Sequence, residues 1–239
     1  MKPSAKLTAQ QFIKELKALS SRDQVDKVAR FFRGDDGRAR DNKIMGITPG
    51  RVFPIAKKFT DLPLTEIDKL LDSPFYEVRL GAVSVMDFQA RAKSTDAAHR
   101  KALFDLYMKR HNRINTWDLV DRAAPYVVGG YLADKQREVL YRLAKSKHPS
   151  ERRTAIVSTY YFIRAGDVAD TFRIAELLAE DGHDLVQKAT GSWLREAGKK
   201  DRDALVTFLE RHAGRMPGTM ARYATEKLDK AQRDKFLAK

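Results

Sequence analysis

A repeat of about 35 residues is the feature that most limits the folds open to this chain. Similar segments, in which basic or amide residues precede small ones, begin at Val78, Glu151, Val186 and Ala221. Halving the first interval places a further start at Ile114, so successive starts are separated by 36, 37, 35 and 35 residues. Two helices and their turns fill such a length, which indicates an α-solenoid.

Between these starts, apolar residues recur every three or four positions, as in FIKELKAL, IDKLLDS, ALFDLYM, REVLYRLAK and IAELLAE. This spacing predicts amphipathic helices of about 10–17 residues with short polar connections. Thr8 and Gln11 have the spacing of a capping box. Thr48 followed by Pro49 is typical of a helix N-terminus. Strand patterns are nearly absent.

We therefore predict an all-α fold, an α-solenoid of HEAT-like repeats. Ankyrin and tetratricopeptide repeats have similar periods, but their signature residues are missing. We expect a single domain over residues 1–239, in which residues 1–75 are less regular and residues 76–230 form the repeats. Equivalent positions of successive repeats line up along the inner wall of a solenoid, so we also expect a concave, basic groove.

The charge balance points to a polyanionic partner. Lys and Arg number 46 against 32 Asp and Glu, giving a net charge of +14 and a pI near 9.9. The chain has no cysteine and no apolar run of the ~18 residues that span a bilayer, and its N-terminus lacks a signal-peptide pattern. Because there is no cysteine, we expect no disulfide. The five histidines show no metal-ligand spacing, so we expect no bound metal.

The segment 31–50 is rich in glycine and charge and has two interpretations. It is either a solvated connection between helices or a phosphate-contacting loop. Its basic side chains are Arg33, Arg38, Arg40 and Lys43.

The stretch RINTWDLVDRAAP (113–125) contains the strongest site candidates. Trp117 and Asp121 lie one helical turn apart, so they share a face, whereas Asp118 and Arg122 are expected to point elsewhere. Pro125 is expected to end or kink this helix.

In the repeat register, Arg153, Ser192 and Trp193 fall on equivalent helices of the next two repeats. Four of the candidates have simpler alternatives, in which Trp117 fills space between helices, Asp118 is a solvated or capping acid, Asp121 pairs with Arg122 or another base, and Arg153 is a surface charge. No Ser-His-Asp set, HExxH or Gly-rich phosphate loop is present. A carboxylate beside an aromatic face is suited to stabilising an oxocarbenium-like sugar during glycosidic cleavage, and an arginine can hold a phosphate.

Four segments resemble the AlkD-type DNA glycosylases, which are bacterial enzymes of HEAT-like repeats: FFRG…IMGITP (31–49), NTWDLVD (115–121), ERRTAI (151–156) and VQKATGSWLRE (186–196). The resemblance covers residues from about 25 to 228. It implies excision of positively charged N3- and N7-alkylated purines from double-stranded DNA, without the full base extrusion of most glycosylases. It also implies a bacterial, cytoplasmic enzyme that acts on the nucleoid. No cofactor is expected, and we expect a monomer without an obligate protein partner.

The resemblance assigns roles by position. Trp117 matches the family's active-site tryptophan, and Asp121 its catalytic aspartate. Arg153 and Arg195 match DNA-contacting arginines, and Phe31 stands where the family often has tyrosine.

One position departs from the family pattern. The family commonly has tryptophan directly after the glycine, where this chain has Ser192, with Trp193 one residue later. A shift of one residue rotates a side chain by about 100° on a helix. Two alternatives to a glycosylase therefore stay open: a non-catalytic or weakly active protein that binds distorted DNA, and a HEAT-repeat scaffold for an acidic protein.

Overall fold

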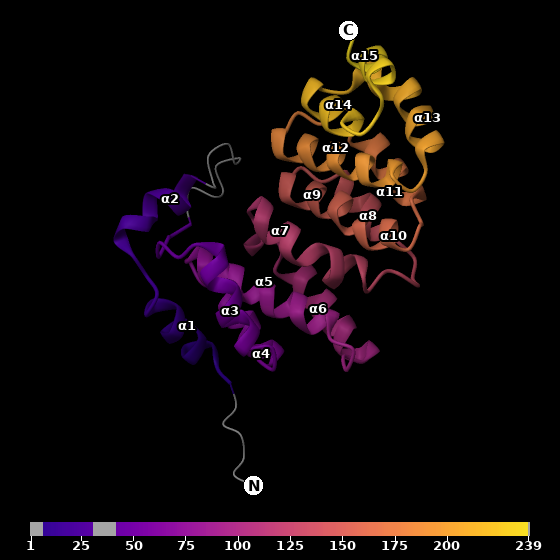
Figure 1. The fold of residues 1–239 in the computed structure, drawn as a ribbon. Helices are drawn as coiled ribbons and strands as arrows, with labels where there is room; N and C mark the ends of the chain where they lie inside the picture. Colours follow the sequence, from indigo (N-terminus) through magenta and orange to yellow (C-terminus); the bar gives the residue numbers. More distant parts are fainter. Residues whose placement is uncertain (1–6, 31–41, 239) are drawn as a thin grey trace. The chain divides into compact units, whose positions relative to one another are not determined.

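The computed structural model describes residues 7–30 and 42–238, which form helices joined by short connections (Figure 1). They belong to two compact units, Met1–Tyr131 and Leu132–Lys239. Among the described residues no strand forms, although Lys43 and Phe75 make an isolated β-bridge. The predicted all-α class is confirmed, and the succession of packed helices is that of an α-solenoid. The single domain and the basic groove stay predictions.

In the first unit, the described helices are α1 (Ala9–Lys17), α2 (Val25–Ala29), α3 (Pro49–Lys58), α4 (Leu64–Leu71), α5 (Tyr76–Arg91), α6 (Ala97–Lys109) and α7 (Trp117–Ala123). A π-helical segment, Ala124–Gly129, follows α7, and two 3₁₀ turns lie at Arg22–Gln24 and His111–Arg113. The second unit contains α8 (Glu138–Ala144), α9 (Pro149–Ser158), α10 (Tyr160–Arg164), α11 (Ala169–Leu177), α12 (Asp184–Gly198), α13 (Arg202–His212), α14 (Gly218–Thr225) and α15 (Lys230–Leu237), with a 3₁₀ turn at Ala213–Arg215.

The predicted repeat starts coincide with helix beginnings. Positions 78, 151, 186 and 221 fall within the first four residues of α5, α9, α12 and α14, and position 114 lies just before α7. Several helices are shorter than expected, and at one of the breaks hydroxyl side chains compete for backbone carbonyls. Between α9 and α10, Ser158 donates to the carbonyl of Thr154 (2.7 Å) and Thr159 to that of Ile156 (2.7 Å).

Two predicted helix N-termini, at Thr8 and at Thr48, are confirmed. The Thr8 hydroxyl accepts from the Gln11 amide (3.3 Å) and the Gln11 side chain accepts from the Thr8 amide (2.9 Å), which completes the predicted capping box. Thr48 is the N-cap of α3 and Pro49 its first residue, although the Thr48 hydroxyl makes no capping bond. At Pro125 the α-helix has already given way to the π-helical segment, as a proline in a helix interior favours.

Helix α5 is the centre of the first unit, where it packs on α3, α4 and α7. All of its residues are buried except Phe88 and Arg91. Its buried polar residues hold neighbouring segments, because buried polar groups require partners. Gln89 donates to the carbonyls of Thr60 (2.7 Å) and Leu62 (2.8 Å), which fixes the turn between α3 and α4.

Glu77, also on α5, holds the chain just before α3. Its carboxylate accepts from the successive backbone amides of Met45 (3.0 Å), Gly46 (2.9 Å) and Ile47 (3.1 Å). Gly46 has a φ of +77°, and an added Cβ would lie 2.0 Å from the carbonyl oxygen of Ser21, so glycine is required there. We call Met45–Ile47 with Glu77 the Glu77 strap.

In the second unit, α12 is central and packs against α9 and α14. Gly191 lets α12 and α14 approach closely. A Cβ at this position would lie 2.5 Å from the carbonyl oxygen of Met220 and 2.6 Å from Cβ of Tyr223. Since one contact is with backbone, the helices themselves must move apart to admit a methyl group.

Gly191→Ala is therefore expected to lower the free energy of unfolding by about 1–3 kcal/mol, the usual cost of overpacking. Chemical denaturation of the purified variant measures the loss. Gly50→Ala is the matched control, since Gly50 lies in α3 with nothing within 4 Å of its added Cβ. Alanine at such a helical position stabilises by about 0.5–1 kcal/mol. Equal stability changes in the two variants would contradict the packing role of Gly191.

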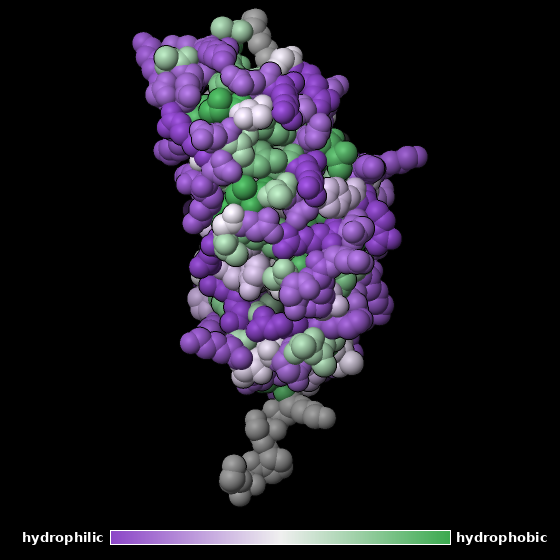
Figure 2. Space-filling view, turned by 90° about the vertical axis from the view of Figure 1, so that its right-hand side faces the viewer, coloured by the Kyte–Doolittle hydropathy of each residue, from purple (hydrophilic) through white to green (hydrophobic). Residues whose placement is uncertain are grey.

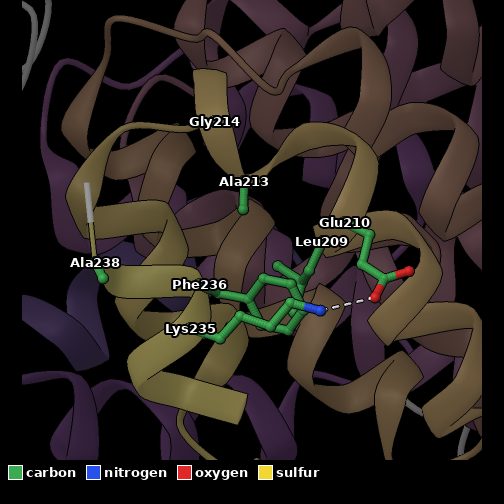
Figure 3. A pocket seen from close by; sticks show the side chains of 7 residues that line it. All are labelled: Leu209, Glu210, Ala213, Gly214, Lys235, Phe236 and Ala238. Atoms are coloured by element: carbon green, nitrogen blue, oxygen red, sulfur yellow. Dashed lines mark hydrogen bonds and ion pairs between the residues drawn. The ribbon is translucent and has the colours of Figure 1, made fainter. Parts of the chain in front are cut away.

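Figure 2 shows one face of the molecule, on which hydrophilic side chains cover most of the surface and smaller hydrophobic patches lie between them. None of the helices in the described ranges is long and apolar enough to span a membrane. Near the C-terminus, a cavity of about 430 Å³ lies between α13, the turn Ala213–Arg215 and α15 (Figure 3). Phe236 lines it, and an ion pair between Lys235 and Glu210 (2.9 Å) lies at its edge.

Candidate active site

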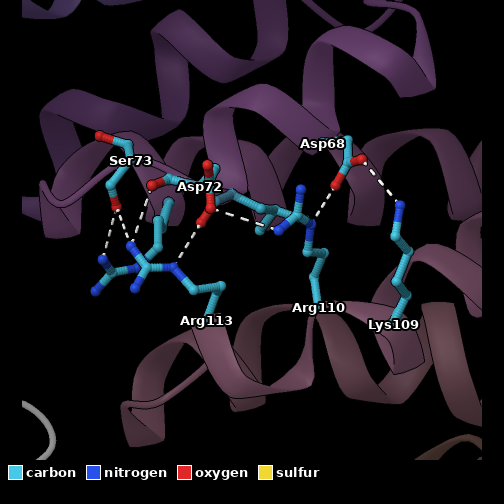
Figure 4. Close-up of polar contacts among 8 residues, drawn as sticks. Asp68, Asp72, Ser73, Lys109, Arg110 and Arg113 are labelled. Carbon is cyan, nitrogen blue, oxygen red and sulfur yellow. Dashed lines mark hydrogen bonds and ion pairs between the residues drawn. The ribbon is translucent and has the colours of Figure 1, made fainter.

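A clamp fixes the chain ahead of α7. Arg113 donates to the carbonyls of Leu71 (3.3 Å), Asp72 (3.2 Å) and Ser73 (2.8 Å), at the C-terminal end of α4 (Figure 4). A cationic side chain on the last carbonyls of a helix satisfies them and complements the helix dipole. Alongside, Arg110 pairs with Asp68. The start of the WDLVD segment is thereby held to α4.

Helix α7 begins at Trp117, with Thr116 as its N-cap residue. At 3.6 residues per turn, Trp117, Asp118, Asp121 and Arg122 cover one face about 140° wide. All four line a single cavity of about 490 Å³. The expectation that Asp118 and Arg122 point elsewhere is therefore wrong, because the cavity spans more of the helix surface than one row of side chains.

The opposite walls of this cavity come from two other helices. Pro49 and Phe53, one turn apart on α3, line it together with Leu80 of α5. We call these seven residues the α7 pocket. It brings together the two predicted catalytic residues, Trp117 and Asp121, and adds an aromatic ring, Phe53, that the sequence analysis missed.

Asp118 is held by two hydroxyl groups. Thr116 donates to Oδ1 (2.6 Å), and the Tyr76 hydroxyl donates to Oδ2. Burial raises the pKa of Asp118, while the bonds from Thr116 and Tyr76 act in the opposite direction. Burial and the charge of Asp118 also raise the pKa of Tyr76, so the shared proton belongs to the phenol. Asp118, for which a solvated or capping role is the alternative, thus has its carboxylate bonded to two side chains.

Arg122 lines the pocket and also pairs with a buried acid. Its guanidinium pairs with Asp87 (3.1 Å), whose side chain is 1% exposed, and donates to the Ser84 hydroxyl (3.1 Å). It also lies over the rings of Phe53 (4.9 Å to the centroid) and Phe88 (4.8 Å). Burial lowers the pKa of Arg122, and the Asp87 charge opposes this.

The candidates of the second unit lie on α9 and α12. Arg153 is 7% exposed and donates to the carbonyl of Leu185 in the first turn of α12. The Trp193 indole donates to the carbonyl of Val157 (3.0 Å) and packs on Tyr160, with 5.8 Å between ring centroids. These contacts connect α12 with α9 and α10. The meeting of Arg153 and Trp193 with the α7 pocket stays a prediction.

Ser192 is half-buried on α12, between Gly191 and Trp193. Arg195 pairs with Glu226 and, at 3.4 Å, with Glu196. In the first unit, Lys43 is exposed. Four predicted DNA-contacting residues lie outside the described residues: Phe31, Arg33, Arg38 and Arg40.

The chemistry available in the α7 pocket is that of two carboxylates, two aromatic rings and the guanidinium of Arg122, which is paired with Asp87. In the described part of the chain, no cluster of His, Cys, Asp or Glu is arranged to hold a metal ion. A further cavity of about 390 Å³ is lined by Thr60, Gln89, His99 and the chain around them, but Gln89 there holds carbonyls of the fold. The α7 pocket can thus surround a flat or cationic group with an aromatic face and acids.

Comparisons with known proteins bear on the family and the fold of this chain. The family model described as DNA alkylation repair enzyme matches residues 12–228. Among solved structures, a "predicted DNA alkylation repair enzyme" from Enterococcus faecalis is similar, with a TM-score of 0.67 and 13% sequence identity. The match covers 88% of this chain and 97% of that one, and at this identity it bears on the fold alone. No curated protein matches the chain.

Proposed function

The chain belongs to the family of DNA alkylation repair enzymes, and on this premise we propose that it is a monofunctional DNA glycosylase. It hydrolyses the N-glycosidic bond of N3- and N7-alkylated, cationic purines and leaves an abasic site. The observation that carries this proposal is that Trp117 and Asp121 line one cavity with Phe53. An acid beside aromatic faces is what a positively charged sugar needs in the transition state.

The proposed roles of the pocket residues follow from the positive charge that develops on the sugar. Asp121 stabilises the oxocarbenium-like deoxyribose and helps to position water, and Trp117 packs on the sugar. The electron pair of the broken bond neutralises the departing cationic purine, so the leaving group needs no proton from the protein. The net charge of +14 attracts the duplex. The resemblance assigns DNA contacts to Arg153 and Arg195, which in the free protein bond to the carbonyl of Leu185 and to Glu226 respectively.

The proposal is tested by incubating the purified protein with DNA treated with a methylating agent. We expect release of 3-methyladenine and 7-methylguanine above the spontaneous rate, with abasic sites accumulating in equal amount. Untreated DNA is the control and should release nothing. If base release equals the rate without protein, the glycosylase proposal is wrong.

Ser192 favours one alternative, a protein that binds distorted DNA without cleaving it. The family's second aromatic position is a serine here, and the neighbouring Trp193 is bonded to Val157. This alternative predicts tight, steeply salt-dependent binding to branched or distorted DNA without base release.

A further inference from the structure

Asp118 is a second acid of the α7 pocket, and its place in the fold is unusual for a carboxylate. It lines the cavity, yet both of its oxygens accept from neutral hydroxyl groups, Thr116 on one side and Tyr76 on the other. Neither partner is a cation, so these bonds hold the charge of Asp118 without cancelling it.

The bases around Asp118 direct their hydrogen bonds to other partners, although the charge of Arg79 interacts with that of Asp118. Arg79 of α5 donates to the carbonyl of Ser73 (2.8 Å) and to the side chains of Asn42 and Asn115 (3.3 Å for Asn115). Arg122, which also lines the cavity, pairs with the buried Asp87 (3.1 Å). Among the described residues, Asp118 therefore faces the cavity without a hydrogen bond or ion pair to a base, and Arg79 offsets its charge only through space.

We propose that Asp118 is a specificity-determining residue of the α7 pocket: its carboxylate, fixed by Tyr76 and Thr116, adds negative potential that favours a cationic occupant over a neutral one of the same shape. This rests on the proposed function for the identity of the occupant, a cationic lesion or the cationic sugar that forms during its excision. Asp121 acts at the reacting sugar, whereas Asp118 acts through the field inside the pocket. The two acids thus make separable contributions.

Two DNA duplexes that differ only in charge test this proposal. One contains a pyrrolidine abasic analogue, which is cationic, and the other contains tetrahydrofuran, its neutral counterpart. The measured quantity is the ratio of the two dissociation constants. We expect the wild-type protein to bind the pyrrolidine duplex more tightly, and Asp118→Asn to reduce this preference about fivefold. A general loss of DNA affinity would change both constants and leave the ratio unaltered.

Two variants separate charge from packing. Asp118→Glu keeps the charge and is expected to retain most of the preference. Asp105→Asn, on the exposed face of α6, removes an acid outside the pocket and should leave the ratio unchanged. If Asp118→Asn does not fold, combined Tyr76→Phe and Thr116→Val replaces it. That pair removes both hydroxyl donors, so the buried carboxylate favours its neutral form and the preference should again fall.

The outcomes distinguish this inference from the proposed function. No preference in the wild type, or an unchanged preference in Asp118→Asn, overturns the role of Asp118 whether or not the protein releases bases. A preference that falls in Asp118→Asn, in a protein that releases no base from methylated DNA, supports the role of Asp118 and rejects the glycosylase.

Discussion

Asp121→Asn is expected to lower the rate of base release from methylated DNA by about a hundredfold to a thousandfold, the usual cost of losing one group aimed at charge that develops in the transition state. Asparagine keeps the size and the hydrogen-bonding oxygen of Asp121 but removes its charge. Because Asp121 lines the α7 pocket with Trp117, the lost attraction acts on the oxocarbenium-like sugar. Single-turnover kinetics with protein in excess measures this step apart from product release.

The controls for this variant concern folding and DNA binding. Asp105→Asn removes an exposed acid of α6 that pairs with Lys101 (2.6 Å) and should release bases at the wild-type rate. Circular dichroism of Asp121→Asn should match the wild type, and its affinity for undamaged DNA should be retained, since a negative charge has been removed. A variant that cleaves as fast as the wild type would exclude Asp121 from the chemistry.

What the sequence could predict depended on short-range rules. The capping box at Thr8 and Gln11 joins residues three apart, so it is visible in the sequence and was confirmed. The shared face of Trp117 and Asp121 follows from helical spacing in the same way, and both residues line one cavity. The predicted repeat starts lie near the beginnings of helices. Helical periodicity and small residues, on which that prediction rests, are both visible within a short stretch of sequence.

The partners that complete the pocket are tertiary and were not predicted. Phe53 reaches the pocket from α3, and Tyr76 binds Asp118 across 42 residues of sequence. No periodicity relates residues so far apart. Helical spacing places Asp118 and Arg122 within about 140° of Trp117, and a pocket can cover more than a third of the helix circumference. The burial of Asp118 could be learned only from the packing of α5 against α7.

Helix α5 shows most clearly that tertiary contacts cannot be predicted from sequence periodicity. Polar residues recur along its sequence, YEVRLGAVSVMDFQAR, yet five of them are buried: Glu77, Arg79, Ser84, Asp87 and Gln89. Each holds a segment or side chain distant in sequence. The polar residues of α5 thus connect the pieces that form the pocket walls, and their loss should be costly.

Glu77→Leu is expected to lower the free energy of unfolding by about 3 kcal/mol or more. Glu77 is fully buried and is the acceptor for the amides of Met45, Gly46 and Ile47. Leucine fills much of the space but leaves three buried N–H groups without this acceptor, and each such group costs about 1–3 kcal/mol. Urea denaturation followed by circular dichroism measures the change.

Two companion variants decide whether the acceptor or the volume matters. Glu77→Gln retains one carbonyl oxygen, so it should lose less stability than Glu77→Leu. Glu15→Gln, whose side chain is exposed and pairs with Lys58 (3.2 Å), should change stability by less than about 1 kcal/mol. If Glu77→Leu is as stable as Glu15→Gln, the strap does not hold the fold.

Hydrogen exchange localises the effect of Glu77→Leu. If the strap is the unit that fails, the amides of Met45, Gly46 and Ile47 should exchange faster in Glu77→Leu than in the wild type, while the core amides of α12 in the second unit keep their protection. Because the Glu77 strap leads directly into α3, release of the strap should also displace Phe53 from the pocket wall. Base release should then fall in Glu77→Leu even under conditions where the protein remains folded, although Glu77 does not line the pocket.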